Sequence, residues 1–130
     1  MRPTIAVFVI ISALLLGGCG TRSGQTRQLR EQDADTPIDL QAGDRLELLL
    51  EGNPTTGYGW EQIGGAETIM KPADKPAFTA ESRLVGAGGT YTFSFSAVAV
   101  GQTSIVMVYH RSFEPDVPPL KTFTVPVVVH

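Results

Sequence analysis

Histidine, cysteine and basic residues are scarce in this 130-residue sequence. The chain has one cysteine, Cys19, so no disulfide can form within it. Its two histidines, His110 and His130, have no carboxylate or second histidine at ligand spacing nearby. Thr55 and Thr56 are conceivable nucleophiles, but no general base is recognisable for them. We therefore expect no metal site, no cofactor and no enzymatic activity.

Positive charge and helical periodicity are equally sparse. The ten Lys and Arg residues are scattered and are outnumbered by 13 Asp and Glu, which gives a formal net charge of -3. This excludes the basic stripe typical of proteins that bind nucleic acid. No segment repeats apolar residues with a helical period, and neither an internal repeat nor a low-complexity tract is evident. The length permits one domain, which we expect to be monomeric.

The longest apolar run is too short to cross a membrane. It covers residues 5–16 after Arg2, about a dozen residues where a membrane-spanning helix needs roughly 20. Small residues follow the run, up to Cys19. The sequence therefore predicts a secretion signal peptide over residues 1–18, separate from the fold.

The segment Leu16-Gly17-Gly18-Cys19 resembles a bacterial lipobox, in which the cysteine is lipidated and becomes the mature N-terminus. An ordinary cleavage site beside an unmodified thiol is the alternative. The resemblance implies a palmitate-bearing lipoprotein that is anchored in the bacterial cell envelope through Cys19. Gly20 after the cysteine is compatible with the outer membrane, facing the periplasm or the cell exterior.

Residues 19–36 lack the apolar spacing of a strand or helix. The part from Gly20 to Thr36 is polar, and Leu29 is its only large apolar residue. We expect this segment to be the lipidated N-terminus and a flexible tether, which holds the domain a few tens of ångströms from the membrane.

Residues 37–130 alternate apolar and polar side chains in short runs, punctuated by Gly, Pro, Asn and Asp. The pattern predicts seven strands, at residues 38–41, 45–51, 58–63, 78–84, 90–100, 102–110 and 120–129. Seven short antiparallel strands with a tryptophan, Trp60, on the third indicate an all-β, immunoglobulin-like sandwich. Pro126 cannot donate to a ladder, so the last strand is expected at an edge or with a bulge.

Three connections between these strands are unusual: residues 53–58, residues 86–89 and the segment that begins at residue 111. In an up-and-down run of antiparallel strands, every second connection lies at the same end of the sandwich. These are the second, fourth and sixth connections. We therefore predict that they converge on one edge.

The residue types suit a rigid binding edge, although each loop alone is also ordinary turn chemistry. Pro54 fixes its own φ angle and Gly57 allows a positive φ, so the two threonines between them lie on a stiff protrusion. The glycines in residues 86–89 let the backbone of a partner approach closely. Phe113 offers an apolar anchor beside the amphipathic Arg111.

In this order, the three motifs resemble those of the chagasin family of cysteine peptidase inhibitors. Residues 53–58 (Asn-Pro-Thr-Thr-Gly-Tyr) match the first motif of that family, and residues 86–89 (Gly-Ala-Gly-Gly) match the second. The third match is partial, because the family usually has Arg-Pro-Trp where this chain has Arg111-Ser112-Phe113. The resemblance spans roughly residues 37–130.

The resemblance implies a reversible, non-covalent inhibitor whose loops enter the active-site cleft of papain-like enzymes. Thr55 would lie over the catalytic cysteine and histidine, residues 85–89 along one side of the cleft, and Phe113 against the other side. The implied peptidase-binding residues are Asn53, Pro54, Thr55, Thr56, Gly57, Tyr58, Val85, Gly86, Ala87, Gly88, Gly89, Arg111 and Phe113. The alternative is a cell-envelope binding module that uses the same edge for an assembly partner or a glycan.

Overall fold

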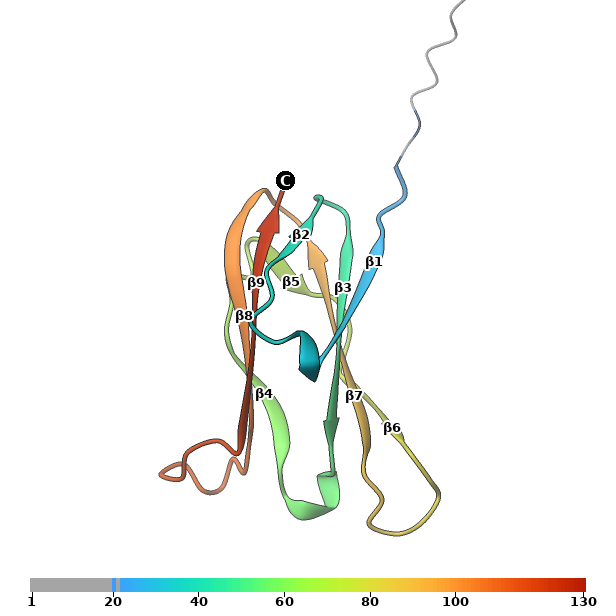
Figure 1. Cartoon of the computed structure of the whole chain (residues 1–130), viewed down its shortest axis with the longest axis vertical. Helices are drawn as coiled ribbons and strands as arrows, with labels where there is room; N and C mark the ends of the chain where they lie inside the picture. Colours follow the sequence, from blue (N-terminus) through green and yellow to red (C-terminus); the bar gives the residue numbers. More distant parts are fainter. Residues whose placement is uncertain (1–19, 21) are drawn as a thin grey trace, which may run out of the picture.

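The computed structural model describes residue 20 and residues 22–130, which form two β-sheets packed face to face (Figure 1). The predicted signal peptide, residues 1–18, and Cys19 lie outside the described residues. In the described part, no helix has the length and apolar character needed to cross a bilayer. The elements are β1 (Thr26–Arg30), η1 (Glu31–Asp33), β2 (Ile38–Leu40), β3 (Arg45–Gly52), η2 (Pro54–Thr56), β4 (Gly59–Gly64), β5 (Met70–Pro72), β6 (Ala77–Ala80), β7 (Gly89–Ala97), β8 (Gly101–His110) and β9 (Lys121–Val129), where η denotes a 3-10 helix.

Alternating apolar residues build the core between the two sheets. One sheet has the order β1-β3-β7-β5, with β6 also paired to β7, and the other has the order β2-β9-β8-β4. Along β3 and β9 every second side chain is buried, which is the periodicity of a strand with one face on a core. The largest buried side chains are Phe95, Phe123, Leu40, Leu46, Leu48, Leu50, Met70, Ile105 and Met107. The all-β sandwich that the sequence predicts is confirmed.

The sheets are mixed rather than purely antiparallel. β1 runs parallel to β3, and β2 runs parallel to β9. The described residues form nine strands where the sequence predicts seven, because β1 and the three-residue β5 are too poor in apolar residues to show alternation. The predicted strand over residues 78–84 ends at Ala80. There the Glu81 N–H donates to the Gly88 carbonyl (3.0 Å) and closes the following loop.

Residues 26–36 belong to the sandwich, so the predicted flexible tether is wrong for this part of residues 19–36. β1 pairs along the edge of β3, and Leu29 packs against the core. The Asp44 carboxylate fixes the chain ahead of β1, because it accepts the Gln25 N–H (2.9 Å) and the Gln41 N–H (2.9 Å). β1 is therefore held by backbone pairing with β3 and by the buried Asp44 carboxylate, although its sequence lacks the alternating apolar residues by which strands are normally recognised.

Pro126 lies in a central strand and not at an edge, since β9 runs between β2 and β8. The Thr124 carbonyl accepts the Asp35 N–H (2.7 Å), and the His130 N–H donates to the Leu40 carbonyl (2.9 Å). The backbone groups of even-numbered β9 residues therefore face the β2 side. Pro126 points its ring nitrogen to the chain just before β2, where the β2 ladder has not yet begun, so no ladder bond is lost.

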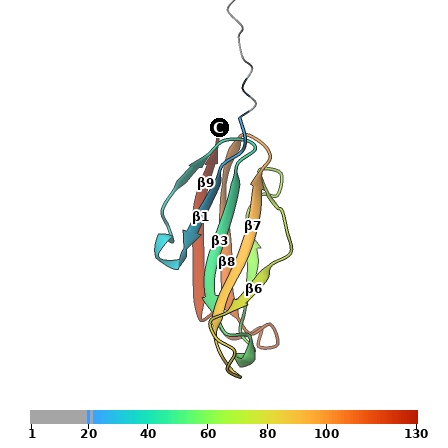
Figure 2. The same cartoon turned by 90° about the vertical axis from the view of Figure 1, so that its right-hand side faces the viewer.

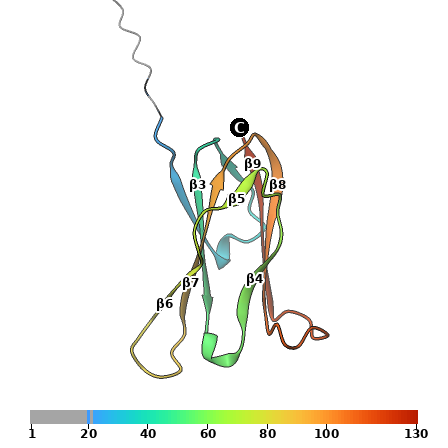
Figure 3. The same cartoon turned by 180° about the vertical axis from the view of Figure 1, so that it is seen from behind.

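Three loops lie together at one pole of the sandwich, as Figures 1 and 3 show: residues 53–58, 81–88 and 111–120. We call this pole the loop edge. The start of β1 and the C-terminal residue lie at the opposite pole (Figure 2). The chain thus enters the domain at one end and displays its long loops at the other.

Candidate functional site

Side-chain hydrogen bonds join the three loops of the loop edge. The Asn53 side-chain amide donates to the Gly86 carbonyl (2.9 Å), and Arg111 Nε donates to the Thr56 carbonyl (3.1 Å). The 53–58 loop is therefore the middle one, as the views in Figures 1 and 3 agree. The convergence that the order of the strands predicts is confirmed.

The 53–58 loop is a turn that caps itself. The Asn53 side-chain oxygen accepts both the N–H (3.1 Å) and the hydroxyl (2.6 Å) of Thr55. The Thr56 hydroxyl donates to the Asn53 carbonyl (2.7 Å). Gly57 ends the turn with a φ of 81°, a left-handed conformation that side chains other than glycine rarely adopt. Residues 54–57 are exposed, so both threonines lie on a stiff protrusion that faces solvent.

An aromatic stack supports this loop. Tyr58 stacks on Tyr109 with 5.4 Å between the ring centroids, and Trp60 packs against Tyr109 at 5.1 Å. Tyr109 is buried, and its hydroxyl oxygen accepts the Asn53 N–H (2.8 Å). The threonine turn is therefore connected directly to the buried end of β8.

Arg111 connects the 111–120 loop to the middle loop. Its guanidinium carbon lies 4.5 Å from the centre of the Tyr58 ring and 5.9 Å from that of the Phe113 ring. Its Nη1 donates to Glu114 Oε1 at 3.4 Å. A Cβ at Gly57 would lie 3.1 Å from the Phe113 ring, so this ring sits beside the threonine turn. Arg111 thus positions the loops and does not only lie at their surface.

Apolar side chains are exposed on both flanks of the middle loop. On one flank Leu84 is 78% exposed, and Val85 is fully exposed. On the other flank Phe113, Val117 and Leu120 are each more than half exposed. Clusters of exposed apolar residues mark surfaces that contact another protein. The loop edge therefore combines a polar centre, formed by two threonines, with two apolar sides.

The sequence model of the Chagasin family peptidase inhibitor I42 matches residues 39–127. The chain belongs to this family. It is 33% identical to Amoebiasin-1 of Entamoeba histolytica over 101 residues, which cover 78% of this chain and 97% of the relative. Its fold is similar to the crystal structure of a cysteine protease inhibitor from Entamoeba histolytica, with a TM-score of 0.76 and 23% identity over 84% of this chain and 99% of the other.

A structure of PbICP-C in complex with falcipain-2 is also similar in fold. Its TM-score is 0.55, with 24% identity over 85% of this chain and 95% of that chain. Chagasin-family proteins are peptidase inhibitors, and this chain is accordingly an inhibitor and not an enzyme. In the part of the chain that the structure describes, no group of three or more His, Cys, Asp or Glu side chains could hold a metal ion.

The second chagasin-like motif divides into contact and packing residues. Residues 85–86 are exposed and residues 87–88 are half-buried, but Gly89 is buried as the first residue of β7. A Cβ at Gly89 would overlap the Thr79 carbonyl and lie 2.8 Å from the Phe78 ring. The expectation that Gly89 contacts a peptidase is therefore corrected: it allows β6 and β7 to approach each other.

Sequence reasoning missed part of the apolar surface. The predicted strands include Leu84 and Leu120, and Val117 is not singled out, yet all three are exposed at the loop edge. One signal could have placed Leu120 in the loop: it follows Pro118 and Pro119, neither of which can donate to a ladder. The roles of Trp60 and Tyr109 depend on strand pairing and leave no local signal.

Two pKa shifts concern groups that support the fold at its two poles. Burial raises the pKa of the Tyr91 hydroxyl, so this phenol stays neutral where it packs against Phe78, 4.9 Å between ring centroids, ahead of the 81–88 loop. At the opposite pole, the N–H groups of Gln41 and Gln25 hold the pKa of the Asp44 carboxyl below its ordinary value. Asp44 is therefore ionised near neutral pH.

Proposed function

We propose that this protein is a reversible, non-covalent inhibitor of papain-like cysteine peptidases that places its loop edge in the active-site cleft. The observation that carries the proposal is the exposed Thr55–Thr56 turn, which is fixed between two apolar flanks. Because the turn is already ordered by its own hydrogen bonds, docking costs little conformational entropy. A rigid centre with apolar sides suits a cleft that has two walls.

In this arrangement Thr55 lies over the catalytic cysteine and histidine. Val85 and Gly86 contact one wall of the cleft, and Phe113 contacts the other wall. A substrate lies extended along such a cleft, whereas residues 54–56 form a helical turn that ends in a left-handed Gly57. The backbone in the cleft is therefore not in the extended form that a peptidase cleaves, which explains how the inhibitor would remain intact.

The similar solved structures support cysteine peptidases as the class of enzyme that this protein inhibits. The similar protein from Entamoeba histolytica is described as a cysteine protease inhibitor, and the similar PbICP-C binds falcipain-2. Both are similar to this chain in fold. These similarities favour a cysteine peptidase over another kind of protein as the partner of the loop edge.

We also propose that the chain is a lipoprotein of the bacterial cell envelope, made with a signal peptide over residues 1–18 and anchored through Cys19 at the outer membrane. The lipobox-like sequence before Cys19 supports this. β1 begins at Thr26, so six residues separate Cys19 from β1, a span of about 25 Å when the chain is fully extended. Because β1 starts at the pole opposite the loop edge, the loops would face away from the membrane (Figure 2).

The inhibitor proposal is tested with soluble protein spanning residues 20–130, titrated against papain and a cathepsin, with trypsin as the control. We expect inhibition of the two cysteine peptidases at nanomolar to micromolar concentration, recovery of activity on dilution, and an inhibitor of unchanged mass. No inhibition at high micromolar concentration would refute the proposal. That outcome would favour the second candidate, a binding module that uses the loop edge for an assembly partner or a glycan.

The anchor is tested separately in bacterial cells. We expect the wild-type chain to incorporate labelled palmitate and to fractionate with the outer membrane, and we expect Cys19→Ala to lose both properties. Equal membrane association of the two chains would contradict the lipid anchor.

A further inference from the structure

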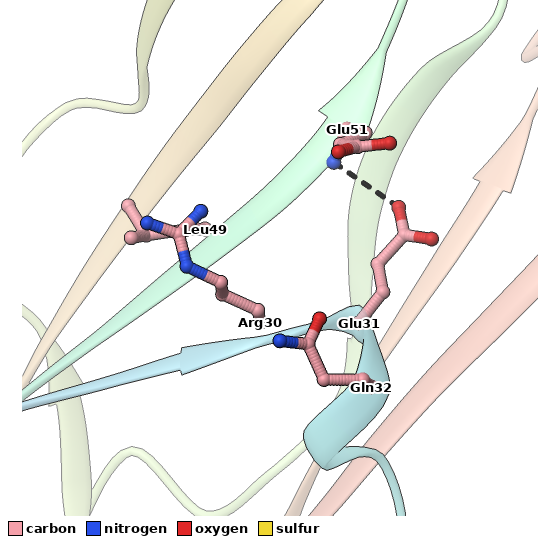
Figure 4. A pocket seen from close by; sticks show the side chains of 5 residues that line it. All are labelled: Arg30, Glu31, Gln32, Leu49 and Glu51. Carbon is pink, nitrogen blue, oxygen red and sulfur yellow. Dashed lines mark hydrogen bonds between the residues drawn. The ribbon is translucent and has the colours of Figure 1, made fainter.

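Glu31 connects two strands that belong to different sheets, just behind the loop edge. Its Oε1 accepts the backbone N–H of Glu51 (3.1 Å), and both carboxylate oxygens contact Lys121 Nζ, at 3.1 and 3.3 Å. Figure 4 shows the Glu31 carboxylate directed at the backbone of Glu51. Glu51 is the penultimate residue of β3, and Lys121 is the first residue of β9. One side chain therefore links the strand that enters the 53–58 loop to the strand that leaves the 111–120 loop.

The position of β1 explains why this contact forms. β1 pairs with β3 as far as Arg30 opposite Leu49, and there the chain turns away into η1. The β3 edge beyond that point would leave the Glu51 N–H without a strand partner. Glu31, the first residue after β1, supplies the acceptor. A side chain thus continues the ladder where the backbone of β1 cannot.

The contacts continue from Glu31 to the threonine turn. Trp60 Nε1 donates to the Glu51 carbonyl (2.9 Å), and Lys121 Nζ lies 5.8 Å from the centre of the Trp60 ring and 5.2 Å from that of Tyr109. Tyr109 accepts the N–H of Asn53, the residue that caps the turn. Glu31 is thereby connected to Asn53 through groups that are each in direct contact.

We propose that residues 26–36 are a brace for the loop edge and that Glu31 is a positioning residue for inhibition. This inference rests on the proposed function, because it assigns the brace to the loops that would enter the peptidase. The match to the chagasin family begins at residue 39, so the brace lies outside the part of the chain that the family model matches. The similar crystal structure covers 84% of this chain, which is more than residues 39–130 alone, so its match extends to residues before 39.

The accepted N–H matters more than the ion pair. The Glu31 and Lys121 side chains are 32% and 39% exposed, and a cavity of about 300 Å³ lies beside the carboxylate, lined by Arg30, Gln32 and Leu49 among others (Figure 4). Water therefore screens the two charges, and such pairs contribute little. A glutamine at this position keeps an oxygen for the Glu51 N–H and loses only the charge, whereas an alanine loses both.

The test compares Glu31→Ala and Glu31→Gln with wild-type protein spanning residues 20–130, by inhibition of papain at 25 °C. Glu67→Ala is the matched control, because Glu67 is an exposed carboxylate in the β4–β5 connection. We expect the inhibition constant to rise about tenfold for Glu31→Ala, and by less than about threefold for Glu31→Gln and for the control. An unchanged constant for Glu31→Ala, or an equal rise for Glu31→Gln, would overturn the role of the accepted N–H.

Trp60 provides a readout that does not need a peptidase, because it is the single tryptophan of the chain. We expect Glu31→Ala to change the emission of Trp60 and to accelerate hydrogen exchange of the Asn53 amide relative to Glu67→Ala. If wild-type protein fails to inhibit papain, the proposed function fails, and the brace is judged by these two signals alone. Emission and exchange equal to the control would overturn the brace.

Discussion

The Asn53 side chain joins its own turn to a loop 33 residues away, because its amide nitrogen donates to the Gly86 carbonyl while its oxygen accepts from Thr55. Both ends of the amide are therefore used. Asp and Ser are usually good substitutes for Asn at a cap, since only an acceptor is needed there. At this position an ionised aspartate has no donor for the Gly86 carbonyl, so it cannot hold the 81–88 loop.

Asn53→Asp separates the two tasks of this side chain. We expect the turn to stay capped and the melting temperature to stay within a few degrees of wild type, whereas the inhibition constant for papain rises on the order of tenfold because the 81–88 loop is released. Asn53→Ala loses the cap as well and should lower stability by about 1 kcal/mol. Hydrogen exchange in residues 81–88 checks the mechanism: equal protection in Asn53→Asp and wild type would contradict it.

The two threonines should respond differently to removal of the hydroxyl. The Thr55 hydroxyl bonds only within the exposed turn, so Thr55→Ala should weaken inhibition on the order of tenfold with nearly unchanged melting temperature. The Thr56 hydroxyl donates to Asn53 and accepts the Tyr58 N–H (3.4 Å), so Thr56→Ala should reduce both inhibition and stability. Thr68→Ala, at an exposed threonine outside the loop edge, is the control; identical behaviour of all three variants would argue against a contact role for Thr55.

Phe113→Trp should strengthen inhibition. The family usually has tryptophan at this position. An indole buries more area than a phenyl ring and adds an N–H donor. We expect the gain in binding free energy to be about 1–2 kcal/mol, which lowers the inhibition constant roughly tenfold. Since Phe113 is 66% exposed, neither Phe113→Trp nor Phe113→Ala should shift the melting temperature by more than a few degrees. Val100→Ala removes a similarly exposed apolar side chain from the opposite pole and should leave inhibition unchanged. A tighter complex with Phe113→Ala would contradict the assigned anchor.

Gly89→Ala should destabilise the fold by about 1–3 kcal/mol, because the new methyl group would be forced into the Thr79 carbonyl. Gly59→Ala is the control, since a Cβ there would have no neighbour within 4 Å. Urea unfolding measures both free energies. Below the unfolding transition, the inhibition constant of Gly89→Ala should remain within about threefold of wild type, as expected for a packing residue. A stable variant with lost inhibition would restore Gly89 as a contact residue.

The free energy of unfolding should decrease at acid pH because the Asp44 carboxylate becomes protonated. Its folded-state pKa is lowered by the N–H groups of Gln41 and Gln25, so its contribution is complete above the ordinary aspartate pKa and is lost as the pH falls through the folded value. The free energy of unfolding should therefore decrease below about pH 4. Asp44→Asn, which cannot titrate, should be less stable at neutral pH and less dependent on pH between 3 and 5. Parallel pH profiles for the two proteins would contradict this assignment.

The position of the loops could be predicted because it depends on chain order alone. Successive strands of residues 37–130 alternate in direction, so every second connection lies at the same pole. Residues 53–58 and 111–120 can therefore be placed at one pole without knowledge of any contact. The cap of Asn53 and the turn at Gly57 are local and are equally visible in the sequence. What the loops bond to across space, such as Gly86, is not.

The N-terminal strand could not be predicted, because its partners are distant in the sequence. Leu29 is one apolar residue among polar ones, and its packing depends on the β3 edge being free. The Asp44 carboxylate that fixes the preceding backbone is 19 residues away from Gln25. Glu31 and Lys121 are 90 residues apart. Local composition favours a flexible tether, and long-range hydrogen bonds override it.

The polarity of the sandwich has a consequence for multivalent binders. β1 starts and β9 ends at the pole that lies farthest from the loops (Figure 2). Two copies joined by a flexible linker from His130 to the next Gln25 are therefore connected only through these poles, and they can lie side by side with both loop edges facing the same surface. Such a tandem protein gains avidity for paired targets on a surface, and the linker passes through neither binding face.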